Sequence, residues 1–339
     1  MQEEEKPKTD YMSNDLMAKE GIEQSYPGAV VDHHLEDGIA TVRCENAVAL
    51  RLYFLTPKML RFRFAHDGDF EDDFSYAIDP AFNPETPEVR VQEHENSLDF
   101  ITSELTVSLS KDSLLITITD QHGTVISRDE KGFHWQGNSE FGGDIVMSSK
   151  ELLGGEQFYG LGDKSCSLNL RKRRFQLWGA DTYGYGRDSD PLYKNVPFYV
   201  GLHHKISYGI FFDNTFRSFF DFGKERSNVT SFFAQGGEMN YYFMLGPSQK
   251  EVAESYAMLT GRPELPPLWA LGYHQCKWSY ESEETVTTIT NKFRELKIPC
   301  DAIYLDIDYM DGFRCFTWNH DRFKDPKAMV QRLESEGFK

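Results

Sequence analysis

One pattern recurs between residues 28 and 247: short runs in which apolar and polar side chains alternate. The run RLYFLTPKMLRFRFA at 51–65 alternates on both sides of a Thr-Pro turn. A longer stretch at 98–126 holds three alternating runs, which SKDS and QHGT separate. Alternation with a period of two indicates strands that bury one face. Because no long helical segment interrupts these strands, the sequence predicts an antiparallel β-sandwich.

The pattern changes after residue 247. Residues 248–264 include the segment SQKEVAESYAMLTGRP, whose apolar side chains fall on one helical face and which ends at a Gly and a Pro. From 265 onward, strand-like and helix-like segments alternate. This order is typical of a parallel α/β fold. The expected elements are strands in WALGYHQCKW (269–278) and CDAIYLDID (300–308), and helices in 282–299 and 325–339.

Both expected helices of the second region carry a start signal. Ser282 can cap the first helix, and Glu283 and Glu284 suit the positive end of its dipole. Asp325 can cap the second helix, with Pro326 in the first turn. Two strand–helix units do not close a parallel barrel, and the second strand would leave an apolar edge unpaired. We therefore expect the 339 residues to be part of a longer protein.

Composition indicates which kinds of binding partner and which cellular compartment to expect for the protein. The formal net charge of −18 would repel a phosphate backbone, so we expect no nucleic-acid partner. No stretch approaches the ~18 apolar residues of a membrane span. The five cysteines are scattered without a CxxC pair, and the charged N-terminus shows no signal peptide. These features favour the cytoplasm and predict no metal site.

Three aspartates follow the second expected strand, in DIDYMD at 306–311. Active sites of parallel α/β folds form at the carboxyl ends of the strands, which is where these side chains lie. If the strand continues, alternation places Asp306 and Asp308 on one face. Asp308 and Asp311 are expected to support the loop after the strand rather than to contact a substrate.

Three chemistries could use this aspartate cluster. A glycosidase needs two carboxylates, a magnesium phosphotransferase could use the DxD at 306–308, and a sugar-binding site could use one Asp to accept hydrogen bonds from hydroxyl groups. Aromatic rings favour a sugar, because sugars present C–H faces that stack on rings, and no glycine-rich phosphate loop follows. The rings near the cluster are Trp278, Tyr280, Phe316 and Trp318.

Five motifs together resemble family 31 of the glycoside hydrolases, in its α-glucosidase branch. The resemblance covers roughly residues 30–339. It implies a multidomain fold, with an N-terminal antiparallel β-sandwich followed by the start of a (β/α)8 (TIM) barrel that is incomplete in this chain. The motifs are FYGLGDK (158–164), LWGADTYGYGRDSDPLYKNVPFYVG (177–201), GIFFDN (209–214), LPPLWALGYHQCKWSY (265–280) and DAIYLDIDYMDGFRCFTWN (301–319).

The predicted domains follow from the pattern and the resemblance together. Residues 1–27 form a polar N-terminal lead, and residues 28–247 form the β-sandwich. Residues 248–264 form a linking helix, and residues 265–339 form the first two βα units of the catalytic barrel.

The resemblance also implies roles for four residues. Asp306 matches the family's acceptor for hydroxyls of the sugar in the cleaved subsite, and Ile307 matches a wall of that subsite. Trp278 matches an aromatic lining position. Asp181 matches the acid on a sandwich loop that reaches over the barrel toward the sugar, although the family often has Asn at the position of Gly179.

The catalytic motifs of the family are absent from these residues, so we expect the nucleophile and the acid/base downstream of Lys339. The implied reaction of the complete protein is retaining hydrolysis of terminal α-linked glucose from oligosaccharides, without a metal or organic cofactor. These 339 residues alone are expected to be inactive. The sequence leaves open whether the protein forms a homo-oligomer. The alternatives are a non-catalytic carbohydrate-binding or scaffold protein and a magnesium-dependent phosphotransferase built on the DxD at 306–308.

Overall fold

The computed structural model describes residues 23–140 and 142–339 of the chain. The chain divides into two compact units, with the boundary between Arg262 and Pro263. None of the helices in the described ranges is both long enough and apolar enough to span a membrane.

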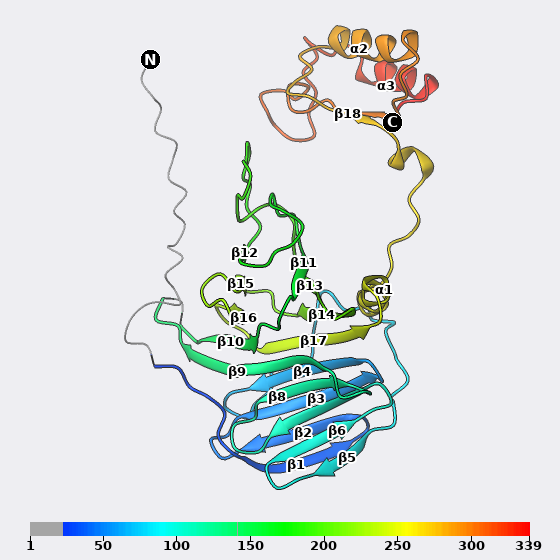
Figure 1. Ribbon diagram of the computed structural model, residues 1–339. Helices are drawn as coiled ribbons and strands as arrows, with labels where there is room; N and C mark the ends of the chain where they lie inside the picture. The colour runs from blue at the N-terminus through cyan, green and yellow to red at the C-terminus, as the bar shows by residue number, and fades with distance from the viewer. Residues whose placement is uncertain (1–22, 141) are drawn as a thin grey trace. The chain divides into compact units, whose positions relative to one another are not determined.

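The first sheet of the first unit has eight antiparallel strands in its described part (Figure 1). Its order is β1-β2-β3-β4-β17-β14-β13-β11, so the late strand β17 pairs with the early strand β4 in the middle of the sheet. The strands are β1 (Val30–Glu36), β2 (Ile39–Cys44), β3 (Ala49–Thr56), β4 (Met59–Ala65), β11 (Gln157–Gly162), β13 (Asn195–His203), β14 (Ile206–Phe212) and β17 (Met239–Gly246).

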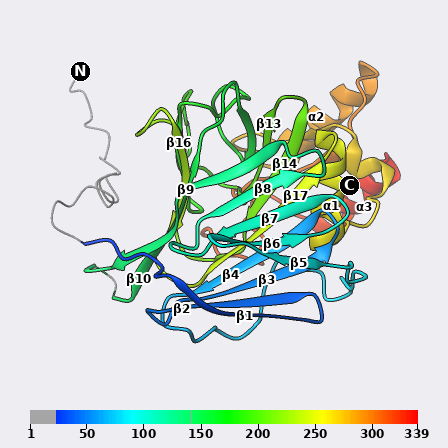
Figure 2. The ribbon, with the colours of Figure 1, turned by 60° about the horizontal axis from the view of Figure 1, so that its bottom comes forward.

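The second sheet has nine antiparallel strands in the described residues, in the order β12-β15-β16-β10-β9-β8-β7-β6-β5. The two sheets lie face to face, as Figures 1 and 2 show from two directions. The strands are β5 (Arg90–Glu93), β6 (Ser97–Ile101), β7 (Leu105–Ser110), β8 (Ile116–Asp120), β9 (Val125–Gly137), β10 (Asp144–Glu151), β12 (Arg174–Leu177), β15 (Ser218–Phe222) and β16 (Val229–Ala234).

Alternation builds the core between the sheets. In β7, Leu105, Val107 and Leu109 are buried and the residues between them are half-buried. Strand β2 of the first sheet alternates in a similar way, whereas every residue of β4 is buried, and its Phe62 ring stacks on Tyr241 of β17 with 4.8 Å between centroids. Fully burying a side chain of this size contributes about 1.5–3 kcal/mol. The expected antiparallel β-sandwich is confirmed.

Helix α1 (Gln249–Thr260) packs on the outer face of the first sheet. It starts at Ser248, whose side chain accepts the N–H of Glu251, while the Glu251 carboxylate accepts the N–H of Ser248. Leu259 of α1 is buried with side chains of β4, β14 and β17, and Tyr256 stacks on Phe198 with centroids 4.1 Å apart.

The second unit begins with the short helix η2 (Leu268–Leu271) and continues as two strand–helix pairs. Strand β18 (His274–Gln275) pairs in parallel with β19 (Ala302–Ile303), and helices α2 (Glu283–Glu295) and α3 (Pro326–Ser335) follow the strands. Ser282 and Asp325 accept backbone N–H groups at the starts of the two helices, which confirms both predicted caps.

The strands of the second unit are shorter than the sequence analysis predicts. Residues 269–278 contain the end of η2 and only the two residues of β18, and β19 ends at Ile303. Asp306 has a φ of 63°, a left-handed conformation that ends any extended backbone. Asp306 and Asp308 therefore do not lie on a strand, and the prediction that they share a strand face is wrong.

Candidate functional site

The parallel register of β18 and β19 brings two of the predicted residues to the same edge. Gln275 lies opposite Ile303, and the N–H of Tyr304 donates to the carbonyl of Gln275 over 2.9 Å. Trp278 and Asp306 each follow at the same distance in sequence from these paired positions. Since the carboxyl ends of parallel strands point the same way, both residues lie beyond the carboxyl end of this two-stranded sheet.

The carboxylate of Asp306 is available for a ligand. Its side chain is half-buried, and within the described ranges no group donates a hydrogen bond to it or forms an ion pair with it. A carboxylate has room for about four hydrogen bonds. Asp306 can therefore accept hydrogen bonds from hydroxyl groups of a bound molecule.

Asp308 and Asp311 are engaged with the loop itself. Asp308 accepts from Arg322 over 3.2 Å, and Asp311 pairs with Arg314. The backbone N–H of Asp311 also donates to the hydroxyl of Thr317 over 3.0 Å. These contacts agree with the expectation that the two acids support the loop.

Exposed apolar side chains accompany Asp306. Trp278 is 88% exposed and Ile307 is 40% exposed, and Phe316 is fully exposed. Single exposed apolar side chains are common on protein surfaces, whereas contiguous patches of them mark binding sites. The placement suits the predicted roles of Trp278 and Ile307, which stay predictions.

Two of the four rings that the sequence analysis associated with the sugar belong to the core instead. Tyr280 is completely buried, and its hydroxyl accepts a hydrogen bond from Gln275 over 3.1 Å. Trp318 packs against the core of the second unit, with 5.0 Å between its ring centroid and that of Tyr309. Tyr280 therefore does not face a sugar, and Trp318 is half-buried against the core.

Sequence reasoning missed a ring pair beside the strands. The hydroxyl of Tyr304 lies 3.2 Å from Nδ1 of His274, and the His274 ring stacks on Trp269. Tyr304 is half-exposed. The pair depends on the register between two strands that are far apart in sequence, so no local signal indicated it.

Asp181 lies on the loop between β12 and β13 of the first unit and is exposed. Burial raises the pKa of Tyr193 on the same loop, and a hydrogen bond to Asp181 adds to this effect. The loop is anchored where Lys164 pairs with Asp190 over 2.7 Å. Asp181 belongs to one unit and Asp306 to the other, so their meeting at a sugar stays a prediction.

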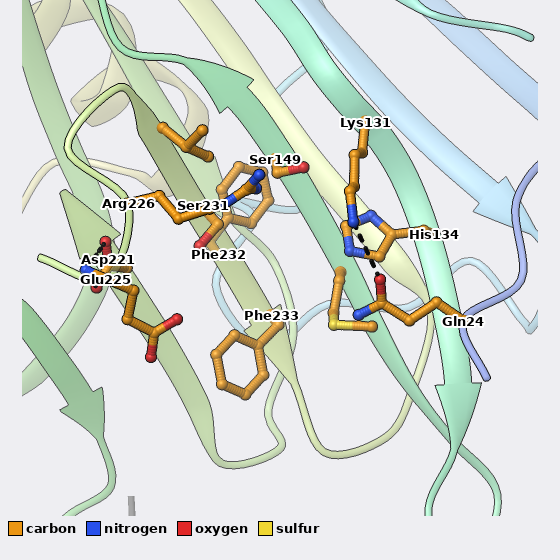
Figure 3. A pocket seen from close by; sticks show the side chains of 12 residues that line it. Gln24, Lys131, His134, Ser149, Asp221, Glu225, Arg226, Ser231, Phe232 and Phe233 are labelled. Carbon is orange, nitrogen blue, oxygen red and sulfur yellow. Dashed lines mark hydrogen bonds between the residues drawn. The ribbon is translucent and has the colours of Figure 1, made fainter. Parts of the chain in front are cut away.

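A small cavity lies on the second sheet of the sandwich (Figure 3). His134, at its wall, donates from Nδ1 to the carbonyl of Gly132 over 2.9 Å, and burial lowers its pKa to about 4. Asp221 accepts the N–H groups of Gly223 and Lys224. The cavity holds about 130 Å³, well below the ~300–1,000 Å³ of small-molecule sites. We therefore assign it no ligand.

Two family models match the chain. Residues 49–221 match the glycosyl hydrolase 31 N-terminal galactose mutarotase-like domain, and residues 263–339 match the TIM-barrel domain of the glycosyl hydrolases of family 31. The chain belongs to glycoside hydrolase family 31. This family's β-sandwich and barrel start agree with the architecture of the two units, so the predicted family and fold class are confirmed.

Similar proteins include two α-glucosidases. Alpha-glucosidase 2 of Bacillus thermoamyloliquefaciens is 34% identical over 319 residues, which are 93% of this chain and 38% of that protein. The α-glucosidase of Saccharolobus solfataricus is 30% identical over 197 residues, which are 58% of this chain and 28% of that protein.

A similar solved structure is the dextranase of Flavobacterium johnsoniae in complex with isomaltotriose. It is 34% identical with a TM-score of 0.84, and the match covers 93% of this chain and 38% of that one. The matched residues thus span 28–38% of the length of these relatives.

Proposed function

We propose that this family 31 chain is part of a retaining glycoside hydrolase of α-glucosidase type, which releases terminal α-linked glucose from oligosaccharides. The observation that carries the proposal is the Asp306 carboxylate, which has no partner among the described residues and lies beyond the same sheet edge as the exposed Trp278. The relatives at 30–34% identity are α-glucosidases and a dextranase, which supports α-linked glucose as the substrate class.

In this proposal Asp306 positions the sugar. Its carboxylate accepts hydrogen bonds from sugar hydroxyls, and a hydrogen bond to a charged group contributes about 1.5–3 kcal/mol. Trp278 and Ile307 contact the apolar faces of the ring and exclude water. The family resemblance assigns Asp181 of the sandwich loop to the same sugar, and this role stays a prediction.

We assign the nucleophile and the acid/base to residues outside this chain. Retention requires two carboxylates about 5–5.5 Å apart, one to attack and one to protonate the leaving oxygen. The family resemblance places both on later barrel strands. Asp306 therefore serves as a binding group rather than as half of a catalytic pair.

The contacts of Asp308 disfavour the phosphotransferase alternative. A DxD magnesium site needs both acids to reach one ion, yet Asp308 accepts from Arg322. Only Asp306 of the two is unpartnered within the described ranges.

A substrate panel tests the proposal on the full-length enzyme. We expect hydrolysis of p-nitrophenyl α-D-glucoside, with α-glucose as the first product in a proton NMR time course. We expect no hydrolysis of the β-glucoside and no magnesium-dependent release from p-nitrophenyl phosphate. Release of β-glucose first, or activity on the phosphate ester alone, would overturn the proposal. Homo-oligomer formation and a cytoplasmic location stay predictions.

A further inference from the structure

A second cavity of the sandwich is large enough for a sugar. It lies on the outer face of the first sheet and holds about 410 Å³, within the ~300–1,000 Å³ typical of small-molecule sites. Its wall combines side chains of β4 and β17 with the segment after β4, the segment after β14 and the residues just before β17. None of these residues belongs to the site proposed around Asp306.

The floor of the cavity offers buried donors and acceptors. The side chain of Arg61 is 9% exposed, donates from Nε to Asn240 over 3.0 Å and pairs with both oxygens of Asp73. A guanidinium group has five N–H donors, so two of those on Arg61 remain for a ligand. Asp213 accepts from Ser75 over 2.9 Å, and its second oxygen has only a 3.4 Å contact with Asn240.

One acceptor in the wall of the cavity has no donor. Glu238 is 10% exposed and accepts from Arg63 through Oε2 over 2.6 Å, whereas its Oε1 is buried without any hydrogen bond. Buried acceptors without a donor are rare and call for an explanation. A donor from outside the protein, or a water that accompanies it, would satisfy this oxygen.

The rim of the cavity presents three aromatic rings. Tyr76 is 86% exposed and meets the ring of Phe74 edge to face, with 4.8 Å between centroids. The ring of Phe216 lies close to Gly236 and Gly237, since a Cβ on Gly236 would come within 2.6 Å of it. Phe216 is 51% exposed, so part of its ring is open to a ligand.

The charges around the cavity disfavour an anionic ligand. Both arginines are paired with carboxylates, and Glu71, Asp72 and Asp213 leave an excess of negative charge that disfavours an anion. No set of three or more His, Cys, Asp and Glu side chains in the described ranges is arranged to hold a metal ion. A neutral, hydroxyl-rich molecule matches what remains: planar charged groups below and rings at the rim.

We propose that this cavity is a saccharide-binding site of the sandwich, in which Arg61 and Asp213 bind hydroxyl groups and Tyr76 and Phe216 stack on the sugar ring. That the saccharide is an α-glucan rests on the proposed function; the preference for a neutral sugar rests on the cavity alone. The site would hold a glucan chain on the enzyme while another part of it is cleaved.

Binding measurements on four variants of the full chain test the site. The probes are glucose, maltotriose and isomaltotriose, followed by isothermal titration calorimetry and by saturation-transfer NMR. We expect Tyr76→Ala and Phe216→Ala to weaken trisaccharide binding about tenfold or more, since each removes a stacking ring. Tyr76→Phe is the matched control and keeps the affinity, because it keeps the ring. Asp306→Asn leaves binding at the sandwich site in place and weakens only binding at the pocket of the second unit.

Each outcome decides the proposal. Loss of binding in Tyr76→Ala but not in Tyr76→Phe or Asp306→Asn supports it. If Asp306→Asn removes all binding while Tyr76→Ala retains it, the sandwich site is overturned and the proposed function stands. Absence of trisaccharide binding by the unmodified chain, or equal affinity in all variants, also overturns it. Unchanged circular dichroism spectra of the variants ensure that altered binding is not unfolding.

Discussion

At the scale of single residues, the most informative group outside the candidate site is Glu156. It is almost completely buried, and its Oε1 accepts from the hydroxyl of Tyr208 over 2.6 Å. Burial raises the pKa of Glu156 to about 7. The folded state therefore holds a proton on this carboxyl at pH values where the unfolded chain has released it.

Glu156 should make the sandwich less stable as the pH rises. Its stabilising contribution is complete below pH about 4.5 and is lost as the pH rises through about 7, a change of about 3 kcal/mol. Between pH 5 and 8, the free energy of unfolding should therefore fall much less in Glu156→Gln than in the unmodified chain. Urea denaturation followed by circular dichroism measures this. Glu88→Gln, at an exposed position, is the control, and equal pH slopes in all three proteins would contradict the assignment.

A second prediction at this scale concerns a buried ion pair. Lys150 and Asp129 lie 2.7 Å apart, with side chains 5% and 2% exposed. Asp129→Asn leaves the lysine charge buried without a counter-charge, which should lower the free energy of unfolding by about 3–5 kcal/mol. The double variant Asp129→Asn/Lys150→Met should recover part of this loss in the same denaturation experiment. A single variant as stable as the unmodified chain would show that the pair is solvated.

At the scale of elements, the contact between β14 and α1 depends on one glycine. A Cβ on Gly209 would lie 2.7 Å from Val252 of α1 and 2.8 Å from the ring of Phe198. Gly209→Val should therefore push the helix away and lower the midpoint of thermal unfolding by several degrees, at about 1–3 kcal/mol. Gly137→Val, at the end of β9 where a Cβ meets no atom within 4 Å and φ is not positive, tests whether lost glycine flexibility alone explains the effect. Equal melting temperatures for Gly209→Val and the unmodified chain would contradict the packing.

Local signals predicted many of the elements. Alternation indicated the strands of the sandwich, and the side chains of Ser282 and Asp325 indicated where two helices start, because caps and strand faces depend on neighbours in sequence. The left-handed turn at Asp306 and the burial of Trp318 were not predicted, since both depend on how the loop after β19 packs. The cavity around Arg61 was also missed, because Asp213 and Asn240 reach it only through strand pairing.

At the scale of the whole molecule, the two units divide the proposed work. The second unit presents Asp306 and Trp278 beyond one sheet edge, and the sandwich contributes the loop of Asp181 and the proposed saccharide site. Both units match domains of glycoside hydrolase family 31. The central claim is that Asp306 binds sugar hydroxyls in the substrate pocket of the full-length enzyme.

The kinetics of Asp306→Asn test this claim most directly, with Asp311→Asn as the matched control on the same loop. Asp311 pairs with Arg314 at the surface, so its variant should keep kcat/KM for p-nitrophenyl α-D-glucoside within about threefold. Asp306→Asn should lower kcat/KM by about a hundredfold or more, with an unchanged melting temperature. Near-native kinetics in a folded Asp306→Asn enzyme would contradict the claim.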